Sequence, residues 1–187
     1  MPVRIDLRLA SLAAGASLAA LAACGTCTPP VPPTVAVPDD LRPPPGETLQ
    51  RTLWANGVQI YECRAKAGAP GTTEWAFVGP EATLADDKGA LVGKHYAGPT
   101  WEAGDGSKVV GTVKARVDAP GGTAIPWLLL ETHNMGKGAG QFARVTSVQR
   151  VATEGGLPPA TGCASAQIGQ KARVDYKAQY VLYAPSF

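Results

Sequence analysis

The sequence predicts an all-β domain, an antiparallel β-sandwich or barrel with few short helices. Three observations support this fold class. Glycine (22) and proline (17) make up about a fifth of the 187 residues, which favours short strands joined by turns. Several runs alternate apolar and polar residues with the period of a strand. No segment sustains an i, i+3, i+4, i+7 apolar stripe over three turns, so long helices are not expected.

Length and composition indicate one domain with appendages. The hydrophobic share of 45% is sufficient for one core. We expect a signal peptide over residues 1–23, a lipidated cysteine with a proline-rich linker over residues 24–45, and a single β-rich domain over residues 46–187. Without residues 1–23 the chain keeps 15 basic and 14 acidic residues, so nucleic acid is not an expected partner.

The N-terminus has the three-part layout of a secretory signal. Arg4 and Arg8 give it a weakly positive start, and residues 9–23 then run without a charge. This apolar run is shorter than the roughly 20 residues that a membrane-spanning helix needs. Cleavage after the triplets at residues 17–19 or 20–22 is the alternative, and it would release a soluble periplasmic protein.

The end of this leader resembles the lipobox of bacterial lipoproteins. Residues 21–24 read Leu-Ala-Ala-Cys, with small residues before a cysteine thiol. The resemblance implies that Cys24 carries the lipid and becomes the first residue of the mature protein, since several acyl chains anchor a protein stably where one does not. In the lipoproteins that this leader resembles, an aspartate after the lipidated cysteine commonly retains the protein at the inner membrane. Gly25 stands at that position here, so we expect the protein on the outer membrane, facing the periplasm.

The segment after the anchor is expected to be a spacer. Residues 28–45 contain eight prolines in eighteen residues and show no apolar periodicity. Such a segment favours extended polyproline conformation at about 3.1 Å per residue. We therefore expect it to hold the domain away from the bilayer.

The domain begins with short strand candidates and ends with longer ones. Two dipeptides, Asn56-Gly57 and Asp105-Gly106, stand between runs and are typical of hairpin turns. A short helix is expected at most near residues 164–170. The strand candidates in chain order are residues 49–54, 58–64, 74–78, 91–95, 99–102, 107–118, 125–130, 144–151 and 173–182.

Three of these runs also predict which side chains are buried. Residues 125–130 are apolar throughout, as expected of a central strand covered on both faces that begins pairing after Pro126. The other two alternate, which predicts half-buried strands. Their predicted buried faces are Val109, Gly111, Val113, Ala115 and Val117 in one run, and Val174, Tyr176, Ala178, Tyr180 and Leu182 in the other.

The cysteines suggest one disulfide. Of the four in the chain, Cys24 is assigned to the lipid and Cys27 lies beside it without an obvious partner. In an oxidising envelope the remaining two, Cys63 and Cys163, are expected to pair.

Six stretches of the domain carry a family resemblance. They are residues 57–63 (GVQIYEC), 80–84 (PEATL), 93–102 (GKHYAGPTWE), 105–107 (DGS), 125–130 (IPWLLL) and 149–156 (QRVATEGG). With these stretches the chain resembles the bacterial and fungal family called domain of unknown function 3455. The resemblance spans residues 47–185 and implies no settled activity.

The densest cluster of groups that could carry chemistry lies at residues 95–107. His95 is a candidate general base or metal ligand, Glu102 or Asp105 is a candidate to orient it, and Trp101 offers a stacking face to a ligand. The candidate ligand-binding residues are His95, Tyr96, Trp101 and Glu102. The structural alternative is that Trp101 packs in the core, Asp105 belongs to a hairpin turn, and His95 and Glu102 satisfy buried backbone groups at strand ends.

Several function classes lack their motifs. The only other histidine is His133, without metal-ligand spacing, so we expect no metal and no cofactor. The first hypothesis is a non-catalytic envelope module that binds a small molecule, a glycan or an envelope protein. A hydrolase or lyase-like enzyme that uses His95 with Glu102 or Asp105 is the alternative, and an assembly scaffold is the second alternative.

Overall fold

The structure is a computed structural model that describes residues 33–186 together with Met1. Residues 2–23 of the expected signal peptide, Cys24 and Cys27 lie outside these residues. Within the described part of the chain, no helix is long and apolar enough to cross a membrane.

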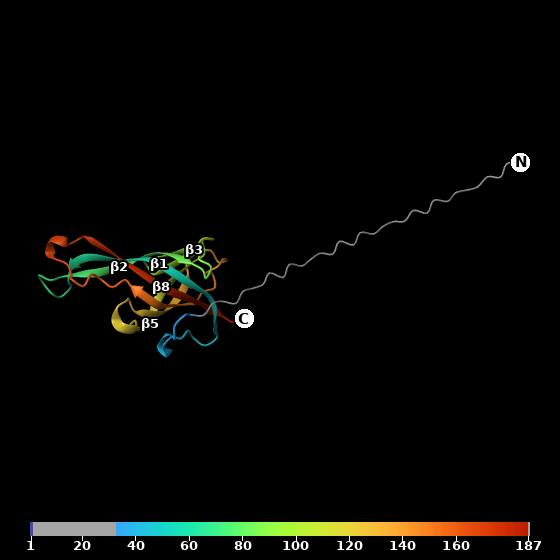
Figure 1. Ribbon diagram of the computed structural model, residues 1–187, viewed down its shortest axis with the longest axis horizontal. Helices are drawn as coiled ribbons and strands as arrows, with labels where there is room; N and C mark the ends of the chain where they lie inside the picture. Colours follow the sequence, from blue (N-terminus) through green and yellow to red (C-terminus); the bar gives the residue numbers. More distant parts are fainter. Residues whose placement is uncertain (2–32, 187) are drawn as a thin grey trace.

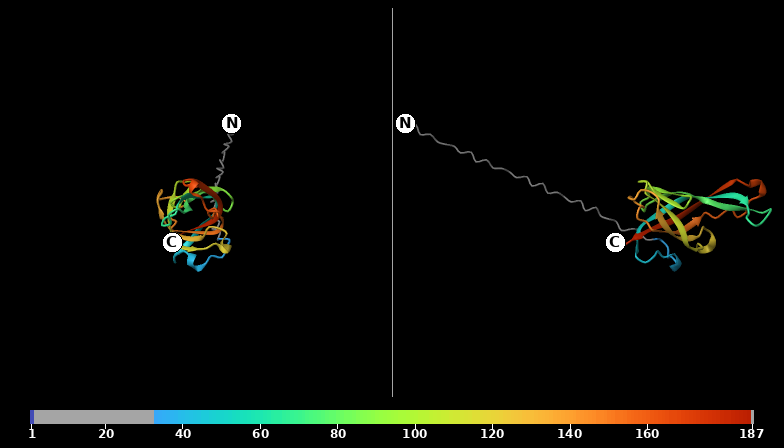
Figure 2. Two further views of the ribbon diagram at one scale, coloured as in Figure 1. Left: turned by 90° about the vertical axis from the view of Figure 1, so that its left-hand side faces the viewer. Right: turned by 180° about the vertical axis from the view of Figure 1, so that it is seen from behind.

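Eight antiparallel strands form one closed barrel (Figure 1). Each strand pairs with the next in sequence, and β8 closes the ring by pairing with β1, which is visible end-on in the left panel of Figure 2. The all-β prediction is confirmed, and of its two forms the barrel is the one observed. The strands are β1 (Glu47–Ala65), β2 (Thr73–Ala85), β3 (Leu91–Tyr96), β4 (Thr100–Ala103), β5 (Lys108–Val117), β6 (Trp127–Asn134), β7 (Ser147–Gly155) and β8 (Lys171–Pro185).

Helical structure in the described residues is restricted to three turns of 3-10 helix. These are η1 (Asp39–Leu41), η2 (Pro120–Gly122) and η3 (Ser165–Gln167). The turn η3 lies within the segment where the sequence allows a short helix.

The barrel interior is packed by residues from every strand. Leu53, Leu84, Trp101, Val148 and Tyr180 belong to this core and are at most 1% exposed. On β8 four residues of the predicted buried face, Tyr176, Ala178, Tyr180 and Leu182, lie in the core, whereas the fifth, Val174, is only partly buried.

A second apolar cluster covers the outer surface of the barrel. Leu41 is fully buried against Trp127, Leu129, Val151 and Val181. Because Leu129 faces outward while Leu130 faces the interior, β6 is covered on both faces as predicted.

The spacer differs from the expectation over its last part. Residues Thr34 to Leu41 lie on the barrel. The Thr34 backbone N–H donates to the Gln179 side-chain oxygen, and the Gln179 amide donates to the Thr34 hydroxyl. The Gln149 side-chain amide donates a hydrogen bond of 2.5 Å to the Leu41 carbonyl oxygen. The physical reason is that the valines and Leu41 between the prolines supply apolar side chains that β6 to β8 bury. In the described residues, the expected linker therefore belongs to the domain from Thr34 onward.

The predicted hairpin turn at Asn56-Gly57 is wrong, because β1 continues through both residues. Gly57 lies opposite Ala82 on β2 and Tyr176 on β8, and it lacks the positive φ that such a turn requires. A Cβ at this position would lie 2.2 Å from the Glu81 carbonyl oxygen, so glycine serves close strand approach here. The Asp105-Gly106 turn does join β4 to β5, with a φ of 83° at Gly106.

The single buried face predicted for β5 is also wrong. A register shift between Val113 and Ala115 inserts one extra residue, and a β-bulge of this kind changes the face of every residue after it. Val109 and Gly111 thus face the interior, whereas Ala115 and Val117 pack in the outer cluster. The same shift places Arg116 on the pocket side of the strand, where its side chain stays 65% exposed.

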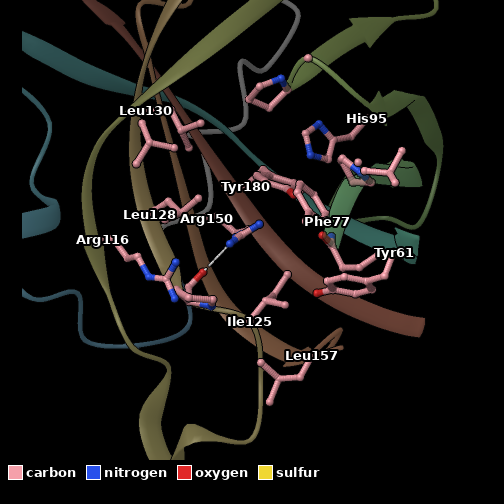
Figure 3. A pocket seen from close by; sticks show the side chains of 18 of the residues that line it. Tyr61, Phe77, His95, Arg116, Ile125, Leu128, Leu130, Arg150, Leu157 and Tyr180 are labelled. Carbon is pink, nitrogen blue, oxygen red and sulfur yellow. Dashed lines mark hydrogen bonds between the residues drawn. The ribbon is translucent and has the colours of Figure 1, made fainter. Parts of the chain in front are cut away.

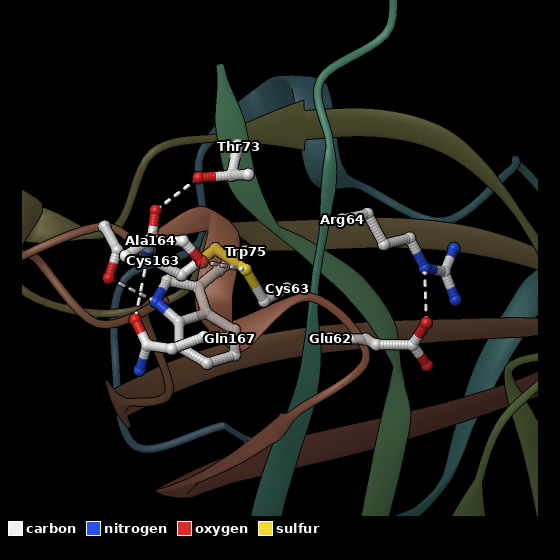
Figure 4. The surroundings of a disulfide bond; sticks show 9 residues. Glu62, Cys63, Arg64, Thr73, Trp75, Cys163, Ala164 and Gln167 are labelled. Carbon is white, nitrogen blue, oxygen red and sulfur yellow. Dashed lines mark hydrogen bonds and ion pairs between the residues drawn. A yellow bond between two sulfur atoms is a disulfide. The ribbon is translucent and has the colours of Figure 1, made fainter. Parts of the chain in front are cut away.

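Cys63 and Cys163 form the expected disulfide, with their Cα atoms 6.0 Å apart (Figure 4). The bridge joins the end of β1 to the segment between β7 and β8. Around it, the Trp75 indole donates 2.7 Å to the Gly162 carbonyl, and the Thr73 hydroxyl donates to Cys163. The long connection from β7 to β8 is thereby fixed at one end of the barrel.

Candidate ligand-binding site

A pocket of about 480 Å³ opens into the barrel beside the core (Figure 3). Most of its wall is apolar, and the polar exceptions are few. The residues that line the pocket include Gln59, Tyr61, Phe77, Val78, His95, Trp101, Val113, Arg116, Ile125, Leu128, Leu130, Arg150, Leu157 and Tyr180. Pockets with such walls and a few placed polar groups are typical small-molecule sites.

The mouth of the pocket is an exposed apolar rim. Phe77, Val78, Val113 and Leu157 all line the pocket and yet are 38–53% exposed. Large apolar side chains that gather in this way at one opening mark a surface for binding apolar material.

The floor is an aromatic cluster around His95. The His95 ring stacks on Trp101, with ring centroids 4.5 Å apart, and meets Tyr180 at 4.8 Å. Its Nδ1 lies 2.8 Å from the Thr100 carbonyl oxygen, which can only accept, so Nδ1 carries the hydrogen. The ring is therefore held in one tautomer, and Nε2 is the acceptor.

Burial keeps this histidine neutral. Its loss of solvent lowers the pKa of His95 from 6.5 to about 3; the bond to Thr100 opposes this shift, and the nearby positive charge of Arg150 adds to it. A metal ligand or hydrogen-bond acceptor is compatible with this state, whereas a general base of pKa near 7 is not.

We predict that acid weakens the fold through His95. The unfolded chain binds a proton near the ordinary pKa of 6.5 and the folded chain only near 3, so stability falls as the pH drops between these values. From pH 7 to pH 5 the free energy of unfolding should fall by about 2 kcal/mol. Urea unfolding at both pH values measures it.

The matched control is His95→Asn, which keeps a side-chain donor but does not titrate. We expect it to be less stable at pH 7 and to lose much less between pH 7 and pH 5. The carboxylates with lowered pKa values act mainly below this window. An equal acid-dependent loss in this variant would contradict the assignment to His95.

Two buried donors in the pocket wall lack a partner. The Gln59 Nε2 and Trp101 Nε1 atoms are buried without a hydrogen bond, in residues that are 2% and 1% exposed. A buried donor without a partner costs roughly 1–3 kcal/mol. A bound molecule with acceptor oxygens could remove part of that cost.

Arg150 brings a positive charge to the pocket. Its Nε and Nη2 donate to the Pro126 carbonyl oxygen at 3.0 and 2.8 Å (Figure 3). On β7 it lies between Leu128 of β6 and Tyr180 of β8, and all three line the pocket. Burial raises the pKa of Tyr180, and the charge of Arg150 opposes that shift.

The structure separates the candidates that the sequence placed together. His95 and Trp101 are opposite each other on β3 and β4 and face the pocket, whereas Glu102 faces outward, opposite Lys94. Outside the barrel, the Tyr96 hydroxyl donates 2.6 Å to Glu102, which also pairs with Lys94 at 3.6 Å. Tyr96 and Glu102 do not line the pocket.

Asp105 organises a turn. Its carboxylate accepts from the Ser107 backbone and hydroxyl, and from the Gln141 amide at 2.8 Å. The Ser107 hydroxyl bond is the main reason that the pKa of Asp105 falls to about 2. Neither carboxylate is thus placed to orient His95, whose Nδ1 hydrogen is already taken by Thr100.

Gln59, Arg116 and Arg150 are pocket residues that sequence reasoning missed. For Arg150 and Gln59, a polar side chain at an inward strand position was the available signal, but it requires the strand register to be known. For Arg116 the bulge in β5 removed even that signal. No group of three or more His, Cys, Asp or Glu residues that could hold a metal occurs among the described residues.

The family described as "Protein of unknown function (DUF3455)" matches residues 44–184. The chain belongs to this family. No curated protein and no solved structure matches the chain. In this DUF3455 chain, five of the six stretches that carry the resemblance contribute to the pocket wall, and residues 105–107 do not. The rest of the wall, which includes Phe77, Val113 and Tyr180, comes from other parts of the barrel.

Proposed function

We propose that this protein is an envelope-anchored lipoprotein whose barrel binds a small, largely apolar molecule in the pocket. The observation that carries the proposal is the pocket itself, which has a volume of about 480 Å³, a mainly apolar wall and a position inside the barrel. The apolar rim adds an entrance suited to such a molecule. A glycan would need more paired polar side chains than this wall offers.

Binding without catalysis is favoured over the enzyme alternative by the arrangement of the candidate groups. The pocket wall contains no carboxylate, and the neutral His95 has its Nδ1 hydrogen on Thr100. Acid–base catalysis by His95 with Glu102 would need both groups on one face of the sheet. A ligand-binding role needs only the apolar wall and the polar groups that face it.

The anchoring half of the proposal rests on residues 21–24 and the apolar run before them. A lipid on Cys24 would keep the barrel at the membrane that supplies apolar molecules. The proposed location is the outer membrane, with the barrel on the periplasmic side.

The neutral apolar dye N-phenyl-1-naphthylamine tests the pocket. We expect its fluorescence to rise on saturable binding to the purified protein. Val113→Trp should weaken binding about tenfold or more, because an indole added at the mouth narrows the entrance. Val113 is 50% exposed, so the fold should tolerate the change.

The control is Leu91→Trp, since Leu91 is 74% exposed on β3 and does not line the pocket. It should bind the dye as the parent protein does. Absence of saturable binding to the parent protein, or equal weakening by both variants, would contradict the proposed function.

A further inference from the structure

We infer that the ligand is anionic: an apolar molecule with a carboxylate end that pairs with Arg150. This inference rests on the proposed function and names the chemical class of its ligand. Three independent features of the pocket wall support it: its charge, its unpaired donors and its apolar remainder.

The charge in the pocket wall has one sign. Arg116 and Arg150 both line the pocket, on either side of Leu128, because the register pairs Arg116 with Leu128 and Leu128 with Arg150. No aspartate or glutamate is among the lining residues. The Arg116 side chain is 65% exposed and pairs with Asp118, whereas Arg150 is half-buried. Low-dielectric walls strengthen the attraction of a charge for an anion, so Arg150 is the residue that would hold it.

Arg150 lacks a carboxylate partner within the described part of the chain. The ion pairs there include Arg116 with Asp118 at 3.9 Å but none with Arg150. Its protein partner at Nε and Nη2 is the neutral Pro126 carbonyl. A guanidinium presents five N–H donors, so its remaining donors can bind a carboxylate while the bonds to Pro126 are kept.

The neutral polar groups point to the same ligand. Gln59 Nε2 and Trp101 Nε1 are buried donors without a partner, in residues that are at least nine-tenths buried. Acceptor oxygens would satisfy them. An uncharged hydrocarbon would leave both donors without a partner and the charge of Arg150 without a carboxylate.

The apolar remainder of the wall argues against a small inorganic anion. Ile125, Leu128 and Leu130 line the pocket, together with the apolar rim, over a volume within the roughly 300–1,000 Å³ typical of small-molecule sites. A chain or ring system is needed to contact this surface, and the carboxylate is its polar end.

The test compares dodecanoate with 1-dodecanol, two probes that share the alkyl chain and differ in charge. At pH 8 and below micelle formation, each displaces the naphthylamine dye from the pocket. We expect the parent protein to bind dodecanoate at least about tenfold more tightly than 1-dodecanol. Arg150→Met should abolish this preference while 1-dodecanol binding persists.

Two further variants separate charge at this site from charge in general. Arg150→Lys keeps the charge without the paired donors and should keep part of the preference. Arg173→Met removes an exposed arginine that pairs with Glu81 outside the pocket, and it should leave the preference unchanged.

Equal binding of the two probes by the parent protein would overturn the inference, and so would an unchanged preference in Arg150→Met. In either case, retained dye binding means that the proposed function stands and only the anion assignment fails. Loss of the preference in Arg173→Met to the same extent would also overturn it. Absence of dye binding to the parent protein would instead be the failure of the proposed function.

Discussion

Replacing both bridging cysteines, Cys63→Ser with Cys163→Ser, should lower the free energy of unfolding by up to about 4–5 kcal/mol. The bridge closes a loop with a sequence separation of 100 residues, and the cost of closing such a loop falls on the unfolded chain. It also fixes the segment that carries Leu157 at the pocket mouth. Urea unfolding of the oxidised parent and the double variant measures the difference.

Cys27→Ser is the matched control, because it removes a thiol that the pairing does not use. It should leave the free energy of unfolding unchanged. A double variant as stable as the parent, or peptide mapping that finds Cys27 bridged to Cys63 or Cys163, would contradict the pairing.

Cys24→Ala is expected to abolish labelling of the protein by a radioactive or alkyne-bearing fatty acid in the producing cell. The reason is chemical: the thioether to diacylglycerol requires a thiol at the cleavage position, and alanine has none. The variant should also leave the membrane fraction, since its stable anchor is lost. Labelling followed by gel analysis measures the effect.

Cys27→Ala is the control here, because it keeps the thiol at position 24. It should be labelled as strongly as the parent. If Cys24→Ala were labelled as well, or if the parent were soluble in the periplasm and unlabelled, cleavage by an ordinary signal peptidase would explain the leader better than lipidation.

The strand pattern alone was enough for the class of fold, because alternation of period two and frequent turn residues report local structure. It was not enough where the register changes. The bulge after Val113 reverses the inner and outer faces of β5, and nothing in the alternating letters marks it. The hairpin prediction at Asn56-Gly57 failed for a similar reason, because a glycine that suits a turn also allows two neighbouring strands to approach closely.

Only part of the site was accessible from sequence. His95 and Trp101 were identified as candidate ligand contacts, and both lie in the pocket wall. Their neighbours Tyr96 and Glu102 point outward because successive strand residues alternate faces. Arg150 joins the site only when β6, β7 and β8 are paired in register, which is a long-range property.

The segment before the barrel illustrates a different limit. Its prolines favour extended backbone, and this holds whether the segment is free or packed. What distinguishes the two states is whether a complementary apolar surface exists elsewhere, and Leu41 finds one on β6 and β8. Composition describes the segment alone and carries no information about that surface.

The central claim is that the barrel holds an apolar carboxylate with its charged end on Arg150. A crystal structure of the protein with dodecanoate tests it most directly. The claim predicts the alkyl chain among Ile125, Leu128 and Leu130, with a carboxylate oxygen within about 3 Å of the Arg150 guanidinium. Dodecanoate bound only outside the barrel, or inside it with the carboxylate turned away from Arg150 to solvent, would contradict it.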